Sequence, residues 1–326
     1  MKKNKIYISA PHIANLFSYA SYYGSSEQLL RLLLNDKKLD VCDPDNTVTE
    51  IEFLKVFRGL LASTNDNYFG LHYGCFLNIK ALGFIAQLSL NATSIEQAIF
   101  ILQTYFKNSF PLVAVEVINE KNNYVLKLTT TITETKLKKH VLDTVFCFLY
   151  RELKLMVTDD LLPQLILPYS NNSEYSKSLN TKVTRGNHYC FVFNNIVLET
   201  EINKKNAKRI EILLPKFLQM LDNDNGSYKP FSTQVRNMML NMCCPELPTF
   251  EQIAVQLPLS ARSIQRKLTF EGLSFRKISD DIKRELSSYL TKGSKMKTQD
   301  IAYLLGYSET SAYLHAAKKW KAELTS

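Results

Sequence analysis

Near the carboxy-terminal end of the chain, one pattern of apolar and polar positions occurs twice, at an offset of 48 residues. The two copies are residues 250–270 and 298–318. Each copy has apolar residues at helical spacing, a short turn, a serine suited to cap a helix and a second helical stretch. The positions that we expect to be buried are Ile253, Ala254, Leu257 and Ile264 in the first copy, and Ile301, Leu304, Leu305 and Ala312 in the second. This order of elements is typical of a helix-turn-helix, and Gly306 stands where the turn needs a positive φ.

A longer amphipathic stretch lies between the two copies, at residues 276–290. Ile278, Ile282, Leu286 and Leu290 follow one another at intervals of four residues. Side chains with this spacing lie on one face of a helix. We therefore expect an all-α carboxy-terminal domain in which a long helix joins two helix-turn-helix units.

The preceding part of the chain mixes helical and strand patterns. Segments predicted to be helical are 26–34, 49–62, 79–90, 94–107, 136–157, 174–179 and 201–221, the last containing Pro215. Alternating residues around the sequence KNN predict a β-hairpin of 112–118 with 124–133, and 165–169 and 189–193 are predicted strands. This combination is typical of an α+β domain.

Composition and charge fit two domains separated by a linker. Residues 222–230 are polar and contain glycine and proline, so we expect an amino-terminal domain at 1–221 and a carboxy-terminal domain at 231–326. The net charge is +9, and residues 231–326 contain 14 Lys and Arg against 9 Asp and Glu. Basic charge is thus denser in the carboxy-terminal domain, as contact with phosphates requires.

No stretch of the sequence is long and apolar enough to predict a membrane span or a secretory signal. The six cysteines are scattered and lack CxxC spacing, which indicates reduced thiols in a cytoplasmic protein. The histidines lack HxxxH and HExxH spacing, and no GxSxG, GxGxxG or phosphate-binding loop is present. Gly70 and Gly74 form a GxxxG pair that packing explains better than a nucleotide does. We expect no enzymatic activity, metal or cofactor.

Residues 260–275 and 300–320 resemble the DNA-binding domain of AraC/XylS-type transcription regulators. The similarity spans roughly the last 80 residues and implies double-stranded promoter DNA and RNA polymerase as partners. Residues 67–99 and 161–199 resemble the arabinose-binding-type amino-terminal domain of such regulators. That resemblance implies a domain that binds a small effector, forms a homodimer, or does both. Nothing in these residues indicates arabinose, and the effector-binding residues remain unknown.

The first repeat carries the stronger set of candidate DNA contacts. Ser260 is expected to cap the second helix, with Ser263 in its first turn. Arg262, Gln265 and Arg266 are expected to face the bases, because Arg and Gln form paired hydrogen bonds with guanine and adenine. Lys267 and Arg276 are better suited to phosphates, which fix position without reading sequence. The simpler interpretation is that these are ordinary solvated helix residues.

The second repeat is less well equipped for base contacts. Its candidate residues are Thr310, Ser311, His315, Lys318 and Lys319, with Glu309, Tyr313 and Leu314 on or beside the same face. The family usually has Arg at the position of His315 and Phe at the position of Ala317. A histidine is mostly neutral at physiological pH and lacks the charge-assisted bonding of Arg. We therefore expect the first unit to read bases and the second to hold the phosphate backbone.

The alternative is an interaction or decoy module that keeps the fold but reads DNA poorly. The operator sequence, the direction of regulation and the effector remain open at this stage. Tyr68, Phe69, Tyr73 and Phe76 could line an apolar pocket, although we expect them to pack in the core.

Overall fold

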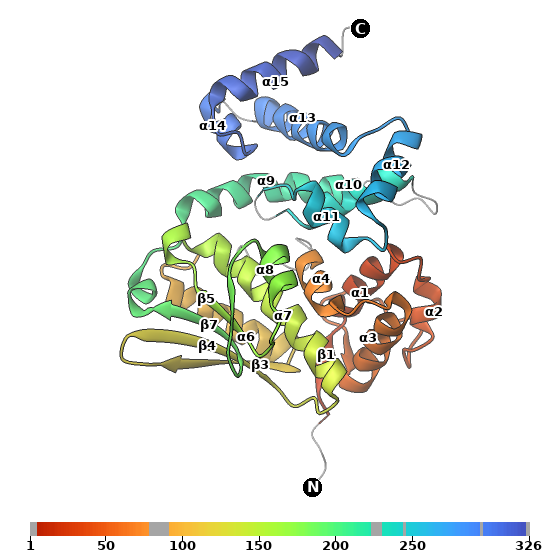
Figure 1. Cartoon of the computed structure of the whole chain (residues 1–326), viewed down its shortest axis with the longest axis vertical. Helices are drawn as coiled ribbons and strands as arrows, with labels where there is room; N and C mark the ends of the chain where they lie inside the picture. Colours follow the sequence, from red (N-terminus) through yellow and green to blue (C-terminus); the bar gives the residue numbers. More distant parts are fainter. Residues whose placement is uncertain (1–4, 78–90, 223–229, 244–245, 294–295, 324–326) are drawn as a thin grey trace. The chain divides into compact units, whose positions relative to one another are not determined.

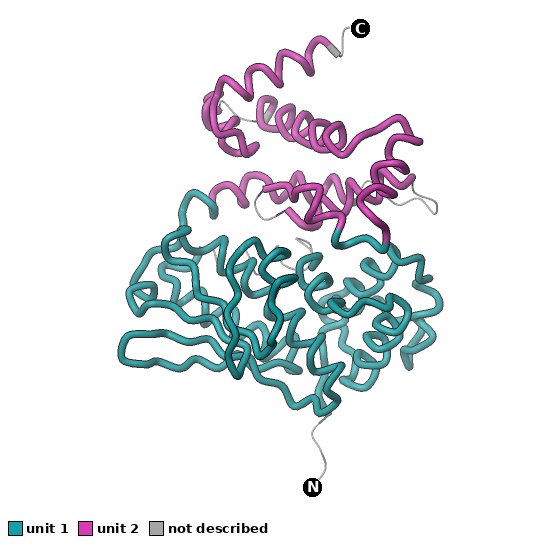
Figure 2. The backbone as a smooth tube through the Cα atoms, viewed as in Figure 1, with its two compact units in different colours: residues 1–207, 255–258 teal, residues 208–254, 259–326 magenta. Residues whose placement is uncertain are grey.

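The computed structural model describes residues 5–77, 91–222, 230–243, 246–293 and 296–323 (Figure 1). The chain divides into two compact units (Figure 2). Unit 1 comprises residues 1–207 and 255–258, and unit 2 comprises residues 208–254 and 259–326. The division therefore falls within the last helix of the expected amino-terminal domain and not in the polar segment after it. The helix expected at 79–90 lies outside the described residues.

Unit 1 is a mixed α+β region, as the sequence predicts. It begins with the antiparallel pair β1 (Tyr7–Ser9) and β2 (Thr47–Thr49), with α1 (Pro11–Ser21) and α2 (Glu27–Arg31) between the two strands. Helices α3 (Glu50–Thr64), α4 (Phe69–Phe76) and α6 (Ile95–Ser109) follow. Strands β1 and β2 and helix α1 had not been predicted, and α2 is shorter than the predicted 26–34 helix.

The main sheet of unit 1 has five strands in the order β3-β4-β7-β5-β6. These strands are β3 (Val113–Asn119), β4 (Asn123–Thr130), β5 (Gln164–Leu167), β6 (Val183–Arg185) and β7 (Tyr189–Asn194). The predicted hairpin is β3–β4, whose pairing runs from Val113 with Thr130 to Asn119 with Tyr124. Neighbouring strands are antiparallel except β5 and β6, which are parallel. The three-residue β6 was missed because it is too short to show alternation.

A 22-residue helix, α7 (Thr135–Met156), forms the centre of unit 1. It contacts β3, β4 and α4, and the rings of Phe146 and Phe191 stack 4.4 Å apart between α7 and β7. The short helix α8 (Ser173–Leu179) contacts β6 and α4. Phe69 and Phe76 of α4 are fully buried, as expected for core residues.

The GxxxG pair lets α4 lie directly on the backbone of α7. A Cβ atom on Gly70 would be 2.2 Å from the carbonyl oxygen of His140, and one on Gly74 would be 2.6 Å from that of Thr144. Gly70 N donates to His140 Nδ1 at 3.2 Å, and Thr144 Oγ1 donates to the Gly70 carbonyl oxygen at 3.2 Å. The two glycines therefore serve close helix packing.

A buried carboxylate joins α7 to the segments beside it. Asp143 is fully buried and accepts hydrogen bonds from Lys139 Nζ at 2.8 Å and from Tyr175 OH at 2.7 Å. Its other oxygen accepts from Tyr189 OH at 2.9 Å and from Tyr169 OH at 3.1 Å. One side chain thus fixes α7, α8, β7 and the segment after β5. The sequence offered no sign of this cluster, because its tyrosines are far from Asp143 along the chain.

Two helices in unit 1 begin with a side-chain cap. Thr49 and Glu52 form a complete capping box, in which Thr49 N donates to Glu52 Oε2 at 3.0 Å and Glu52 N donates to Thr49 Oγ1 at 3.3 Å. Ser94 also caps its helix, since Gln97 N donates to Ser94 Oγ at 3.2 Å. The Gln97 side chain, however, accepts from Thr93 N at 2.7 Å rather than from Ser94 N. The capping box at the start of α6 is therefore only half formed.

Unit 2 is helical in its described residues. It contains most of α9 (Lys204–Asp222) and of α11 (Phe250–Gln256), together with α10 (Phe231–Asn241), α12 (Ala261–Phe270), α13 (Phe275–Gly293), α14 (Thr298–Leu304) and α15 (Thr310–Glu323). Pro215 lies inside α9. Helix α13 contacts α10 and α14, and its apolar residues Ile278, Ile282, Leu286 and Leu290 are all buried, as their spacing predicts.

The interior of α15 differs from the repeat pattern. Ala312, which the pattern predicts to be buried, is exposed, whereas Tyr313 is only 5% exposed. The hydroxyl groups of Tyr313 and Ser287 lie 2.9 Å apart, and the Tyr313 ring contacts Tyr307 and Trp320. The buried face of α15 therefore starts one position later than the 48-residue offset implies. Ala312 was a wrong prediction, and Tyr313 is a core residue.

Candidate nucleic-acid interface

Helix α12 has a well-defined start. Ser260 is its N-cap residue, with φ −67° and ψ 152°, and its Oγ accepts from Ser263 N at 3.2 Å. This is the bond expected of a capping serine. Ile264 and Leu268 are buried, which fixes the rotation of the helix and leaves the opposite face toward solvent. Ser263, in the first turn, is half-buried.

The exposed face of α12 carries the residues that we expect to read bases. Arg262, Gln265 and Arg266 are all exposed. Within the part of the chain that the structure describes, neither arginine forms an ion pair with a carboxylate. Two guanidinium groups and an amide are therefore available on one side of a short, capped helix. Arg266 follows Arg262 by four residues, so the two side chains are neighbours on the helix surface.

The two candidate phosphate contacts beside this face differ in their surroundings. Lys267 is exposed, and its Nζ lies 5.3 Å from the centroid of the Phe231 ring at the start of α10. The neighbouring Glu271 accepts from Phe231 N at 2.7 Å and from Ser232 N at 2.8 Å. These contacts fix the end of α12 against the start of α10. Arg276 is exposed in the first turn of α13.

The second pair of helices has the turn that the sequence predicts and a weaker surface. Gly306 has φ +75°, and Tyr307 N donates to the Ala302 carbonyl oxygen at 3.0 Å to close the turn. On α15, Ser311, His315, Lys318 and Lys319 are exposed, and Thr310 is half-buried. Ser311 Oγ donates to Glu309 Oε2 at 3.0 Å, so a carboxylate lies near the first turn of α15. That negative charge disfavours phosphate there.

Replacing Ser260 with alanine is expected to loosen α12 without changing its exposed side chains. Loss of an N-cap serine costs about 1 kcal/mol. Hydrogen exchange of the α12 amides should therefore quicken by about fivefold, since 1.4 kcal/mol corresponds to a factor of ten. Ser288→Ala is the matched control, because Ser288 is exposed in α13 and does not cap a helix. Equal exchange in both variants would contradict the capping role.

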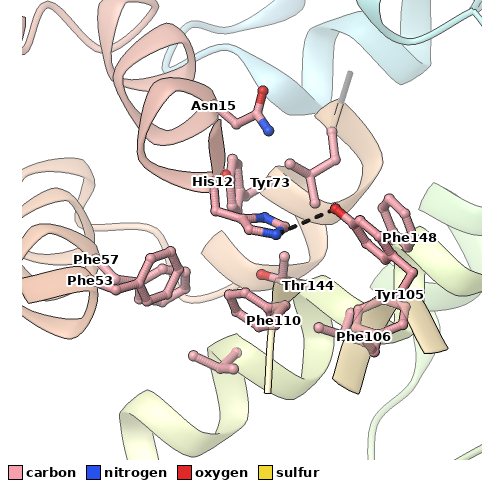
Figure 3. A pocket seen from close by; sticks show the side chains of 13 residues that line it. His12, Asn15, Phe53, Phe57, Tyr73, Tyr105, Phe106, Phe110, Thr144 and Phe148 are labelled. Atoms are coloured by element: carbon pink, nitrogen blue, oxygen red, sulfur yellow. Dashed lines mark hydrogen bonds between the residues drawn. The ribbon is translucent and has the colours of Figure 1, made fainter. Parts of the chain in front are cut away.

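Unit 1 contains a separate candidate ligand site, a pocket that sequence reasoning missed (Figure 3). It encloses about 490 Å³ of space between atoms, part of which is open to solvent. Five phenylalanines line it: Phe53, Phe57, Phe106, Phe110 and Phe148. Its polar lining includes His12 and Asn15 of α1 and Tyr105 of α6. Of the four aromatic residues considered from the sequence, Tyr73 lines this pocket. His12 and Asn15 are one helical turn apart. Had α1 been predicted as a helix, this spacing would have placed both polar side chains on the same face.

Comparison with known proteins identifies the family. A family model described as the arabinose-binding domain of AraC transcription regulators, at the amino terminus, matches residues 31–202. The chain belongs to this family of AraC regulators. The ornithine utilization regulator of Pseudomonas aeruginosa is 31% identical to this AraC-family chain over 94 residues, which are 29% of this chain and 27% of that protein. The HTH-type transcriptional regulator VqsM of the same species is 30% identical over 88 residues, 27% of each protein. The matched segments span about a quarter of the length of these two regulators.

A solved structure also resembles this AraC-family chain. It is the crystal structure of the transcriptional regulator CdpR from Pseudomonas aeruginosa, with 16% sequence identity and a TM-score of 0.40. The alignment covers 82% of this chain and 88% of that one. In the described part of the chain, no helix is long and apolar enough to cross a membrane, and no group of three metal-ligating side chains is found.

Proposed function

We propose that this AraC-family protein is a sequence-specific regulator that binds double-stranded promoter DNA through unit 2. In this proposal, α11–α12 and α14–α15 are two helix-turn-helix units, with α12 and α15 as the helices that enter the major groove. The observation that carries the proposal is the exposed face of α12, where Arg262, Gln265 and Arg266 extend from a capped helix. A helix presenting Arg and Gln on one side fits the major groove and its base edges.

The length of α13 supports the proposed placement of the two helix-turn-helix pairs in successive major grooves. It has 19 residues, which corresponds to about 28 Å at 1.5 Å per residue. Successive major grooves on one side of a duplex are about 34 Å apart. A rigid connector of this length, together with the widths of the flanking helices, suits two groove contacts by one protomer. The Ser287–Tyr313 hydrogen bond connects α13 to α15 and supports a fixed spacing.

The two helix-turn-helix pairs are proposed to have different tasks. The α11–α12 pair reads bases through Arg262, Gln265 and Arg266, with Lys267 and Arg276 at phosphates. The α14–α15 pair holds the phosphate backbone of the DNA mainly through Lys318 and Lys319, helped by Thr310, Ser311 and His315. A small effector or homodimerisation through unit 1 controls binding, and RNA polymerase is the partner in transcription. An effector exerts this control only by favouring one conformation over another.

Binding of the full chain to the DNA upstream of its own gene tests the proposal. Arg266→Ala is expected to weaken specific binding by about 1–3 kcal/mol, or roughly 5- to 150-fold. Arg185→Ala is the matched control, because Arg185 is an exposed arginine of unit 1, and it should bind like the wild type. Binding should also weaken steeply with salt, because phosphate contacts release counterions.

The alternative of an interaction or decoy module predicts a different result in the same binding experiment. A module that keeps the fold but does not read DNA would bind specific and unrelated duplexes equally. Its Arg266→Ala variant would then match the wild type on both. That outcome would replace the regulator proposal with an interaction module.

A further inference from the structure

The pocket in unit 1 contains a buried polar group that lacks a partner. Asn15 is 8% exposed and lines the cavity, and no hydrogen bond is found for its Nδ2 among the described residues. Buried polar atoms in folded proteins are nearly always hydrogen-bonded, so an orphan of this kind needs an explanation. An amide NH₂ that faces a cavity is suited to donate to an oxygen atom of a bound molecule.

The remaining polar groups of the lining are few, and most already have partners. His12 Nε2 lies 2.9 Å from Ser109 Oγ. It also lies 3.3 Å from Tyr105 OH (Figure 3). Thr144 Oγ1 donates to the carbonyl oxygens of His140 and Gly70. Burial lowers the pKa of His12 to about 4, so its imidazole is neutral at physiological pH. Among the described residues that line the cavity, none is Lys, Arg, Asp or Glu. The cavity is therefore unsuited to a charged ligand, whose desolvation it could not offset.

The rest of the wall is aromatic and aliphatic. The rings of His12 and Phe110 lie 4.9 Å apart, those of Phe53 and Phe110 lie 5.2 Å apart, and those of Phe106 and Phe148 lie 5.6 Å apart. These rings contact one another and form an apolar wall against which a flat apolar ring can pack. A pentose has hydroxyl groups all round and would leave most of them without partners here. The lining thus disfavours the sugar in the family's description.

We propose that this pocket binds a small, uncharged, mainly apolar ring compound whose carbonyl oxygen accepts a hydrogen bond from Asn15 Nδ2. The phenylalanines surround the ring, and Asn15 fixes the orientation of the carbonyl group. This proposal rests on the effector part of the proposed function and assigns the effector's chemical class and binding site. It does not depend on whether unit 2 binds DNA.

Calorimetry on the full chain without DNA tests the proposal with four probes. Acetophenone has the required ring and carbonyl, toluene lacks the acceptor, benzoate adds a charge, and L-arabinose replaces the ring with hydroxyl groups. We expect saturable binding of acetophenone, weaker binding of toluene, and none of benzoate or L-arabinose. Binding of benzoate or L-arabinose in preference to acetophenone, or no binding of acetophenone, would overturn the assigned ligand class.

Asn15→Leu tests the role of the amide. The variant should bind acetophenone about tenfold more weakly and toluene as tightly as the wild type, because only acetophenone accepts the hydrogen bond. Asn67→Leu, at an exposed position of unit 1 outside the pocket, should leave both affinities unchanged. Equal loss for the two probes would refute the hydrogen bond. Should Asn15→Leu melt below the wild type, the four-probe comparison on the wild type still decides the ligand class. Because DNA is absent throughout, failure here leaves the DNA-binding proposal standing.

Discussion

Among Gly→Ala substitutions at the described glycines of unit 1, Gly70→Ala is expected to be the most destabilising. The new Cβ would lie 2.2 Å from the carbonyl oxygen of His140 and 2.7 Å from its Cα. Both atoms belong to the backbone of α7, so no side-chain rotation can relieve the clash. Helices α4 and α7 would have to separate, which would also stretch the bond from Gly70 N to His140 Nδ1. Overpacking of this kind costs about 3 kcal/mol, so the melting temperature of unit 1 should fall by roughly 10 °C.

Gly59→Ala is the matched control for that experiment. It makes the same chemical change in the helix α3, where the new Cβ would meet only side-chain ends, Leu33 Cδ1 at 3.1 Å and Leu30 Cδ2 at 3.9 Å. These flexible groups can move, and alanine favours a helix by about 1 kcal/mol over glycine. Calorimetric melting of the two variants should therefore differ clearly. A similar fall in both would mean that close helix packing is not what requires glycine at position 70.

Asp143→Ala is the second change with a large expected effect. It removes the acceptor of four hydrogen bonds and leaves Lys139, Tyr169, Tyr175 and Tyr189 without their shared partner. Breaking a buried ion pair costs about 3–5 kcal/mol, and we expect the lower end because Lys139 is partly exposed and can be hydrated. Urea unfolding of unit 1 should show the loss. Asp160→Ala, at an exposed position, should cause almost none.

The pH dependence of stability offers a further test of Asp143. Burial raises the pKa of this carboxyl group, against the opposing effects of Lys139, Tyr175 and Tyr169. The folded state therefore holds the proton more tightly than the unfolded state. This contribution to stability is fully present below the unfolded pKa, about 3.9, and is lost as the pH rises through the folded pKa. Asp143→Ala should lack this decline, and an identical pH profile in both proteins would contradict the raised pKa.

What the sequence could predict depended on local pattern. The spacing of Ile278, Ile282, Leu286 and Leu290 placed α13, and Ser260 marked the start of α12, because these signals lie within a few turns of one helix. The hairpin β3–β4 was found for the same reason. The 48-residue repeat failed inside α15, where Tyr313 takes the core position expected for Ala312. A comparison at a fixed spacing of 48 residues cannot detect that the buried face of one copy has shifted by one residue. The burial of each side chain in the structure does show this shift.

Features assembled from distant segments could not be predicted in this way. The partners of Asp143 come from α7, α8, β7 and the segment after β5. The pocket likewise brings His12 and Asn15 together with Tyr105 and Phe148. Contacts between segments that are far apart in the sequence leave no short-range pattern. In addition, the helix α1 was not predicted. Of the candidate DNA contacts, the exposure of Arg262, Gln265 and Arg266 followed from the helical pattern of α12, while their task on DNA stays a prediction.

Helix α9 determines how a carboxy-terminal fragment has to be cut. Most of α9 belongs to unit 2, where Arg209 Nε donates to the Leu304 carbonyl oxygen at 3.0 Å and Lys216 pairs with Glu285 at 2.9 Å. A fragment that begins at Phe231 would lose these partners along with the buried residues Leu213 and Phe217. One that begins at Lys204 keeps them. Expression trials that start at the polar segment would therefore discard a structural part of the fragment they aim to isolate.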